Sequence, residues 1–354
     1  MTLPWPRRRT VSTKNLAIAT RQLAVMLGAG VPLAQCLDLL GSEERDPLLA
    51  ETLLALRDDI ESGASFAAAL AARPRVFDEL YVGMAAAGEA GGVLHTMLGR
   101  LADCAEKSVA LRGQVRAAMM YPVAVLLIAA VVVGVILWKV IPTFAELFDG
   151  LGAVLPLPTR VVIAASDSLP VAAPVLMIVA GGTAWIGRRW YATPRGRRAL
   201  DGVRLRLPVI GPLLRKLVVA RFCRTLATLL GAGVPILDGL TITAGTSGNA
   251  VVADAVRATR SAIEQGSSVA APLRSTGVFP PMVTQMVGVG EATGSLDALL
   301  SKVADFYEAE VDRAVAGFTA LLEPVLIALL GAIVGGIVIA MYLPVFDLIS
   351  RLAG

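Results

Sequence analysis

Apolar residues gather in three long uncharged runs along this chain of 354 residues. The runs cover Ala117–Trp138, Ser168–Gly187 and Pro324–Phe346, and each holds between 20 and 23 residues. A helix rises 1.5 Å per residue, so each run is long enough to cross about 30 Å of hydrocarbon. A buried core helix is the alternative, most of all for the second run, which two prolines and a Gly-Gly pair interrupt. A membrane helix tolerates such breaks when neighbouring groups satisfy the freed carbonyls, so three membrane spans are expected.

The rest of the chain has a helical pattern of apolar positions. Leu23, Leu27, Leu37 and Leu40 recur at spacings that place them on one side of a helix. The segment Gly30–Pro32 interrupts this row, because glycine adopts unusual dihedral angles and proline lacks an amide hydrogen. No strand-like alternation of useful length is present. The pattern therefore predicts helices that end and restart at such breaks.

The pattern also repeats itself at an offset of about 200 residues. Residues 21–33, Arg-Gln-Leu-Ala-Val-Met-Leu-Gly-Ala-Gly-Val-Pro-Leu, match residues 224–236, Arg-Thr-Leu-Ala-Thr-Leu-Leu-Gly-Ala-Gly-Val-Pro-Ile. Residues 88–94 match residues 290–296, and both segments begin Gly-Glu-Ala. Because the offset changes by one residue over about 125 positions, a duplication is the natural explanation. One helical domain followed by one membrane helix occurs twice, and the second span lies outside the repeat.

Each copy should be a bundle of five or six short helices, about 100 to 115 residues long. The fold class is thus an all-α membrane protein with two homologous helical-bundle domains and three transmembrane helices. Helices are expected over Pro47–Ser62 and Asn249–Gln265, before capping glycines at Gly63 and Gly266. A second pair is expected over Asp78–Ala87 and Pro281–Val289, ending at Gly88 and Gly290. A third, longer pair runs from Val93 to about Arg116 and from Ser295 to about Phe318.

These patterns divide the chain into eight parts in order. A short N-terminal segment, 1–13, precedes the first domain, 14–116, and the first span, 117–141. A loop, 142–167, and the second span, 168–187, follow. A basic linker with the second domain, 188–318, the third span, 319–346, and a tail, 347–354, complete the chain.

Composition and charge indicate how the chain is oriented across the membrane. The chain is 56% hydrophobic and only 17% charged, and its formal net charge is +4. Residues 188–221 contain ten arginines and lysines with one aspartate, whereas residues 140–167 contain one arginine and three acids. By the positive-inside rule the basic segment and both domains face the cytoplasm, and the loop and C-terminal tail face the periplasm. Lipid headgroups are then the expected anionic partners of the basic segment, and nucleic acid is not expected.

No residues for catalysis or metal binding emerge from the pattern. Cys36, Cys104 and Cys223 are widely spaced and odd in number, so neither a disulfide framework nor a zinc site is predicted. The single histidine, His95, should lie on the surface at a helix start. A phosphate-binding loop and a metalloprotease motif are both missing. No cofactor and no enzymatic activity are expected.

Two matched acids and their glycines are candidates for function. Glu89 and Glu291 follow Gly88 and Gly290 in equivalent turns. Each carboxylate either neutralises the N-terminus of the following helix, where the dipole favours an anion, or contacts a partner or marks a hinge. Glu323 stands at the rim of the third span, where an interfacial role is favoured over an ion path. Gly331 and Gly335 form a small-xxx-small pair that permits close helix packing.

These motifs, in order and in duplicate, resemble the type II secretion F protein family over about residues 11–349. The shared features include the Ala-Gly-Val-Pro breaks, the Gly-Glu turns followed by Asp103 and Asp305, and the prolines Pro122 and Pro324 at the starts of spans. The resemblance implies an inner-membrane platform that binds a cytoplasmic ATPase, other inner-membrane components and pilin-like subunits, and that forms homo-oligomers. Some members resemble calcium binders at the position of Asp103, but Gly99 stands one turn earlier and a lone carboxylate is a poor site for calcium.

The resemblance leaves several functions open. A type II secretion platform is the first reading, and a type IV pilus assembly platform is the alternative. A transporter or channel would need polar residues within the spans, and Lys139 and Glu323 lie only at their ends. An intramembrane protease would need catalytic groups at membrane depth. The segment before the first domain is shorter than is usual in the family, which leaves any contact made by that segment open.

Overall fold

The computed structural model describes residues 11–150, 155–208 and 210–352, and in these ranges it contains helices and no strands. The all-α prediction is thus confirmed. The chain forms two compact units, one made of residues 1–113 and 198–312 and the other of residues 114–197 and 313–354. The first unit holds both copies of the repeated domain, and the second holds the long apolar helices.

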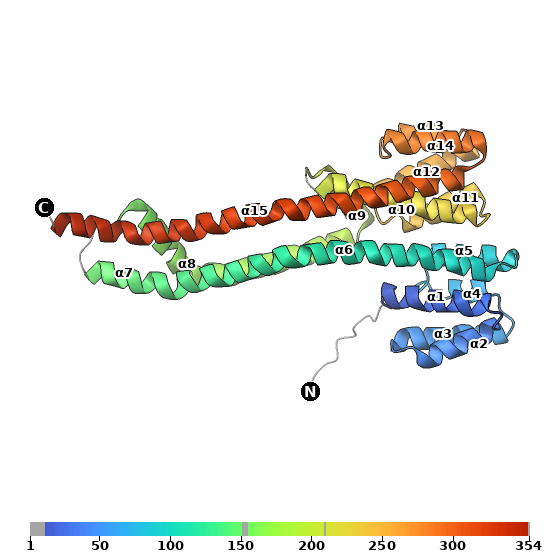
Figure 1. Ribbon diagram of the computed structural model, residues 1–354, viewed down its shortest axis with the longest axis horizontal. Coiled ribbons are helices and arrows are strands. Elements are labelled where there is room, and N and C mark those ends of the chain that lie inside the picture. The colour runs from blue at the N-terminus through green and yellow to red at the C-terminus, as the bar shows by residue number, and fades with distance from the viewer. Residues whose placement is uncertain (1–10, 151–154, 209, 353–354) are drawn as a thin grey trace. The chain divides into compact units, whose positions relative to one another are not determined.

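The first copy is a bundle of six helices around a leucine-rich core. Phe66 and Leu98 are among its fully buried side chains, together with a row of leucines from the first four helices. Figure 1 shows α1 to α4 packed beside α5 and the beginning of α6. The helices are α1 (Thr13–Gly28), α2 (Leu33–Glu43), α3 (Pro47–Glu61), α4 (Phe66–Ala71), α5 (Glu79–Ala90) and α6 (Leu94–Val135).

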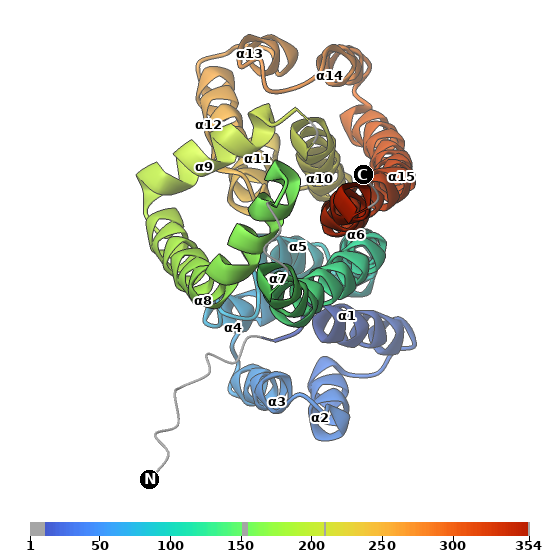
Figure 2. The same ribbon diagram turned by 90° about the vertical axis from the view of Figure 1, so that its left-hand side faces the viewer.

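The second copy repeats this order after one additional helix. Phe222, Leu240 and Leu273 are fully buried in a second core. Figure 2 shows α13 and α14 as neighbours, and it shows α2 and α3 as neighbours in the first copy. The helices are α9 (Pro194–Arg206), α10 (Ile210–Gly231), α11 (Ile236–Thr246), α12 (Ala250–Glu264), α13 (Ala270–Ser275), α14 (Pro281–Thr293) and α15 (Leu296–Leu352).

The breaks between the helices follow the sequence signals. Gly30 and Gly233 adopt φ angles of 85° and 81°, which a residue with a side chain rarely adopts. Pro32 and Pro235 then stand directly before α2 and α11. The helices α3 and α12 end within one residue of the predicted positions. The short helices α4 and α13, of six residues each, were not predicted, since six residues are too few for a clear period.

The two copies pack against each other within the first unit. Helix α5 contacts both α10 and α11. Leu229 of α10 belongs to the buried core of the first copy, and Ile242 of α11 packs against that core. The two domains therefore share apolar surface instead of standing as separate modules.

The second unit contains helices that are long and apolar enough to cross a membrane. There are three of them within the described residues, each covering one predicted span. Helices α6 and α15 continue from the domains into the spans without a break, through Pro122 and Pro324. The segment 142–167, expected as a loop, is largely helical, because α7 (Ile141–Gly150) and the start of α8 (Leu157–Tyr191) occupy it.

Hydroxyl groups connect the apolar helices of the second unit. Thr159 of α8 donates a hydrogen bond to the backbone carbonyl of Ala340 in α15. Ser166 of α8 donates to the carbonyl of Leu137, which lies in the π-helical turn Ile136–Val140. A π turn frees carbonyls from the regular helical pattern, and a neighbouring hydroxyl satisfies one of them here.

Candidate functional site

An arginine in the first helix of each copy holds two carboxylates on the long helix. In the first copy, Arg21 of α1 donates from Nε and Nη2 to the two carboxylate oxygens of Glu106, both at 2.8 Å. Its Nη2 also donates to Asp103. Because residues three apart lie on the same side of a helix, Asp103 and Glu106 both face α1. We call this set of three residues the first clasp.

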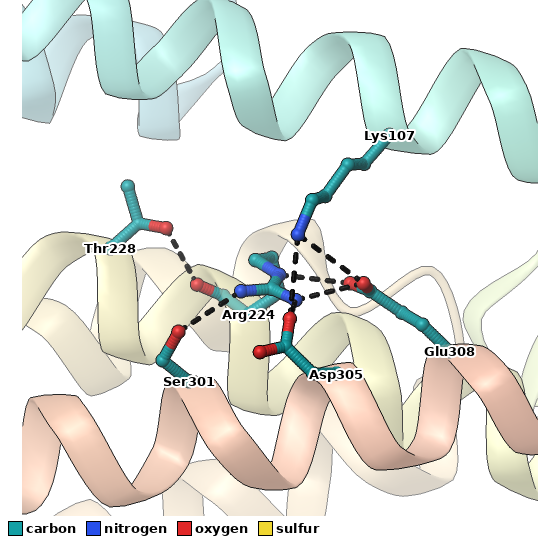
Figure 3. Close-up of polar contacts among 6 residues, drawn as sticks. All are labelled: Lys107, Arg224, Thr228, Ser301, Asp305 and Glu308. Carbon is teal, nitrogen blue, oxygen red and sulfur yellow. Dashed lines mark hydrogen bonds and ion pairs between the residues drawn. The ribbon is translucent and has the colours of Figure 1, made fainter.

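The second copy contains the same arrangement, which we call the second clasp. Arg224 of α10 donates to both oxygens of Glu308 at 2.8 Å and also to Asp305, as Figure 3 shows. Its Nη1 additionally donates to the Ser301 hydroxyl at 3.1 Å. The hydroxyl of Thr228 donates to the backbone carbonyl of Arg224 and supports that turn of α10. A guanidinium that bridges two carboxylates in this way fixes both distance and orientation between helices.

The two clasps differ in exposure. The Arg21 side chain is 36% exposed and that of Glu106 is 46% exposed. The corresponding values for Arg224 and Glu308 are 13% and 16%. The pair of Arg224 and Glu308 therefore lies largely away from solvent, where an ion pair is screened less than at the surface, whereas Asp305 is 49% exposed.

The charges in the clasps shift one another's pKa values. Hydrogen bonds from Arg21 lower the pKa of Glu106 below its ordinary value. Burial opposes the charge of Asp305, but hydrogen bonding and attraction to Arg224 and Lys107 outweigh this effect and lower the pKa of Asp305. Burial also opposes the charge of Arg224, and the hydrogen bonds that Arg224 donates to Glu308 and Asp305 nevertheless raise its pKa. Glu106, Asp305 and Arg224 are consequently charged at neutral pH.

Lys107 connects the two copies through the second clasp. It extends from α6 of the first copy, and its Nζ lies 3.4 Å from Oδ1 of Asp305 and 3.6 Å from Oε2 of Glu308. Figure 3 shows the ammonium above both carboxylates. The equivalent position in the second copy is Ala309, which carries no charge. The long helix of the first copy is therefore bound directly to the long helix of the second.

A cavity of about 520 Å³ lies between the clasps. Its walls carry mixed charge from both copies, including Arg100 and Asp297 together with clasp residues. Cys104 also lines it, but burial raises the pKa of this thiol to about 11, so the reactive thiolate is scarce at neutral pH. These groups suit the holding of helices more than chemical catalysis.

Glu89 and Glu291 cap helices, although not the helices that the sequence suggested. Oxygens of Glu89 in α5 accept hydrogen bonds from the backbone N–H groups of Phe66, at 2.9 Å, and Ala67, at 3.2 Å. Glu291 in α14 accepts in the same way from Val269, at 2.9 and 3.0 Å, and from Ala270. The capped helices are α4 and α13, which lie about 20 residues earlier in the chain. The expectation that each acid caps the following helix is therefore wrong.

Gly88 and Gly290 do not end their helices either. Each lies inside α5 or α14, which end at Ala90 and Thr293. A Cβ atom on Gly88 would lie 2.9 Å from the Cα of Leu94, and one on Gly290 would lie 2.8 Å from the Cα of Leu296. These glycines therefore permit the close approach of the following long helix, and each turn is made a few residues later.

The other candidates lie apart from the clasps. His95 is exposed at the start of α6, as expected, and Glu323 is exposed within α15 of the second unit. Asp103, which the sequence made a poor calcium ligand, accepts a hydrogen bond from Arg21. Among the described residues, no group of three or more histidine, cysteine, aspartate or glutamate side chains is placed to hold a metal ion.

The clasp residues other than Asp103 and Asp305 were missed as candidates. A signal for them was present, because Arg21 and Arg224 begin the two longest matching segments. Glu106 and Glu308 also match at the offset of 202 residues. What the repeat could not show is that these residues meet, since more than 80 residues separate them along the chain.

Together, the duplicated helical bundle and the long helices that continue from it into membrane spans define a class of membrane-anchored scaffold. The family model of the type II secretion system protein F matches residues 19–142 and 222–344, which are the two copies with their following spans. The chain belongs to this family, and the predicted resemblance is confirmed. The two matches also confirm the internal duplication.

Curated relatives come from both pilus and secretion systems. The chain is 48% identical to the type IV pilus assembly protein PilC of Myxococcus xanthus, over 96% of this chain and 81% of that protein. It is 48% identical to PilC of Thermus thermophilus, over 96% and 84% of the two chains. The type II secretion system protein F of Vibrio cholerae is 34% identical over 96% and 84%. An inner-membrane location agrees with this family and with the three apolar helices.

Proposed function

We propose that this protein is the inner-membrane platform of a type IV pilus assembly machine. The observation that carries this proposal is the difference in identity, 48% to pilus assembly proteins against 34% to secretion proteins across nearly the same length. The sequence alone favoured a secretion platform, and the comparisons support the pilus alternative better. In either system the role is that of a scaffold without catalysis of its own.

The clasps give this scaffold a route for mechanical coupling. Each clasp ties the first helix of a domain to a long helix that continues into a membrane span. Displacement of either domain would therefore pass directly into α6 or α15. A platform that couples a cytoplasmic ATPase to the insertion of pilin-like subunits needs such rigid connections, and it needs no active site.

The partner surfaces of the two copies differ in charge. Residues 33–62, which form α2 and α3, contain eight acidic and two basic residues. The equivalent residues 236–265 of the second copy contain three acidic and two basic residues. Because complementary charge governs encounter and specificity, the first copy is the better candidate for a basic partner surface such as one on the motor. In this proposal both domains and the N-terminus face the cytoplasm, and the C-terminus faces the periplasm.

Deletion and complementation in the native host test the choice of system. Loss of surface pili with normal protein export, restored by the intact gene, is the expected result. Loss of export with normal pili would overturn the pilus assignment and return the secretion platform. If the intact gene restores neither pili nor protein export, and the purified chain transports a solute, the platform role itself would be overturned.

Co-purification from membranes tests the partners. The intact chain should retain the assembly ATPase encoded nearby. The triple variant Glu43→Gln, Glu51→Gln, Glu61→Gln should retain less of it, because these exposed acids lie on or beside α2 and α3. A matched control, Asp238→Asn, Glu264→Gln, Asp312→Asn, removes three exposed acids elsewhere in the first unit and should retain the normal amount. Equal retention by all three forms would show that the acidic surface is not the binding site.

A further inference from the structure

Helix α9 precedes the helices of the second copy, and most of it, from residue 198 onward, belongs to the first unit. It begins at Pro194, three residues after α8 ends at Tyr191, and it carries five arginines. Its single acid, Asp201, is almost completely buried. The arginines lie on the exposed part of the helix, so α9 presents a strongly positive surface.

Two contacts hold α9 firmly against the second domain. Oδ2 of Asp201 accepts a hydrogen bond of 2.9 Å from the backbone N–H of Ala250, the first residue of α12. Asn249 caps the next two N–H groups of α12, so Asp201 supplies an additional cap at a positive helix end. Arg198 also pairs with Asp254 at 2.7 Å. The inner side of α9 is therefore occupied, and its opposite side faces outward.

The outward side of α9 has a defined composition. Arg195, Ala199, Val203 and Arg206 follow one another at spacings of four, four and three residues, which places them along one face of a helix. All four are exposed, and Val203 is 57% exposed. We call these residues the outer stripe. It combines a charged residue at each end with an apolar centre, and it contains no acid.

The end of α8 that leads into α9 has the features of a membrane interface. Trp185 and Trp190 are exposed there, at 64% and 50%. The Arg189 guanidinium lies 5.7 Å from the centre of the Trp185 ring, a distance typical of cation–π contact. Tryptophan and arginine are the residues that gather where a membrane helix meets the headgroups. With only two residues between the helices, α9 begins close to that level.

We propose that the outer stripe of α9 binds the anionic phospholipid headgroups of the membrane. Arginines attract the anionic headgroups, and an apolar centre between them suits the boundary between headgroups and acyl chains. Arginines alone would suffice to bind the phosphates of a nucleic acid, and an exposed valine would not contribute to that binding. The proposal rests on the membrane helices and not on the choice between pilus and secretion systems.

Site-specific fluorescence in nanodiscs tests the proposal on the full chain. An environment-sensitive dye is attached to Val203→Cys in a Cys104→Ala background, where the remaining cysteines, Cys36 and Cys223, are fully buried. Nanodiscs that contain phosphatidylglycerol should give a blue-shifted emission and quenching by spin-labelled lipid. Nanodiscs of phosphatidylcholine alone should give less of both. The exposed control Ser62→Cys, at the end of α3, should show neither response.

Removal of charge separates lipid binding from insertion of the valine alone. The variant Arg195→Gln, Arg206→Gln should lose the difference between the two kinds of nanodisc. The matched variant Arg45→Gln, Arg274→Gln removes two exposed charges elsewhere and should keep the difference. Equal emission at position 203 in both nanodiscs, with quenching by aqueous iodide, would overturn the proposal. If an oligonucleotide shifts the emission of the dye and anionic lipid does not, the outer stripe would be a nucleic-acid site and the proposal would also be overturned.

Discussion

The two clasps contain the same residue types in the same geometry, yet their surroundings differ. Arg21 and Glu106 are about one-third to one-half exposed, whereas Arg224 and Glu308 are about one-sixth exposed or less. Among the described residues, the second clasp alone receives a cation from the other copy, because Lys107 reaches it and Ala309 occupies the equivalent position. The duplication therefore preserved the connection within each domain, while the contact between the copies made the second connection the more protected one.

This difference predicts that the stability of the two copies depends on their clasps to different extents. An exposed ion pair adds little to stability because water and salt screen it. A buried pair adds little net energy when intact, but the loss of one partner leaves a charge without compensation. The second copy should thus tolerate changes at its clasp less well than the first. The predictions below test this contrast, beginning with the largest expected effect.

Loss of the arginine should separate the two copies most clearly. Arg224→Met should lower the free energy of unfolding by about 3 kcal/mol, because Glu308 would remain poorly exposed without its main partner. Arg21→Met should lower it by about 1 kcal/mol, since its partners face water. Thermal unfolding of the purified chain in detergent, followed by circular dichroism, measures both. Equal effects would contradict the idea that burial distinguishes the clasps.

Addition of a methyl group at the matched glycines should instead affect both copies alike. Gly88→Ala and Gly290→Ala each place a Cβ within 2.9 Å of the backbone of the following helix. Such overpacking costs about 1 to 3 kcal/mol, because one helix must move.

Gly99→Ala is the control for the glycine variants. It is also helical, but a Cβ there would meet nothing within 4 Å. It should leave the thermal unfolding temperature unchanged or raise it. Stability of Gly88→Ala and Gly290→Ala equal to that of the intact chain would show that the helices do not need this close approach.

Much of this architecture could be predicted from the sequence, because local signals decide it. The spans follow from long uncharged runs, and the breaks at Gly30 and Gly233 follow from dihedral preference. The roles of Gly88 and Glu89 could not be found in this way. Both depend on helices that approach from other parts of the chain, namely α6 and α4. The clasps could not be predicted for the same reason, because their residues lie far apart in the sequence. Each of these residues nevertheless matches between the two copies.

The caps that Glu89 and Glu291 form on α4 and α13 should contribute about equally to the stability of the two copies. Glu89→Ala or Glu291→Ala removes the acceptor for N–H groups at the start of α4 or α13, and a lost cap costs about 1 kcal/mol. Glu51→Ala, on the exposed surface of α3, is the control and should cost much less. Thermal unfolding measures the three variants.

Charge reversal at both caps distinguishes stability from assembly. The double variant Glu89→Lys, Glu291→Lys should reduce pilus formation in cells, because α4 and α13 would lose their anchors. Normal piliation at normal protein level would show that pilus assembly does not need these two caps.

Acid should weaken both clasps through their carboxylates. The folded-state pKa values of Glu106 and Asp305 lie below the ordinary values, so their stabilising effect is present above about pH 4 and is lost as the pH falls through the lowered values. Thermal unfolding temperatures measured from pH 6 to about pH 3 should fall less steeply in Arg21→Met and Arg224→Met, since those variants lack the interactions that lower the pKa. Parallel curves for variants and intact chain would show that the clasps do not cause the acid sensitivity.

Replacement of Lys107 should have the smallest effect on stability and the most specific one on the pairing of the copies. Lys107→Met removes contacts of 3.4 and 3.6 Å to carboxylates that Arg224 still binds, so the loss should be below about 1 kcal/mol. If the lysine serves mainly to join α6 to α15, a cross-link between cysteines placed on these helices should form less readily in Lys107→Met, while Lys107→Arg should preserve it. Combination of Lys107→Met with Arg224→Met should then cost more than the sum of the single changes, because Asp305 and Glu308 would lose both cations together. Strict additivity would mean that the first copy does not support the second clasp, and that its protection comes from burial alone.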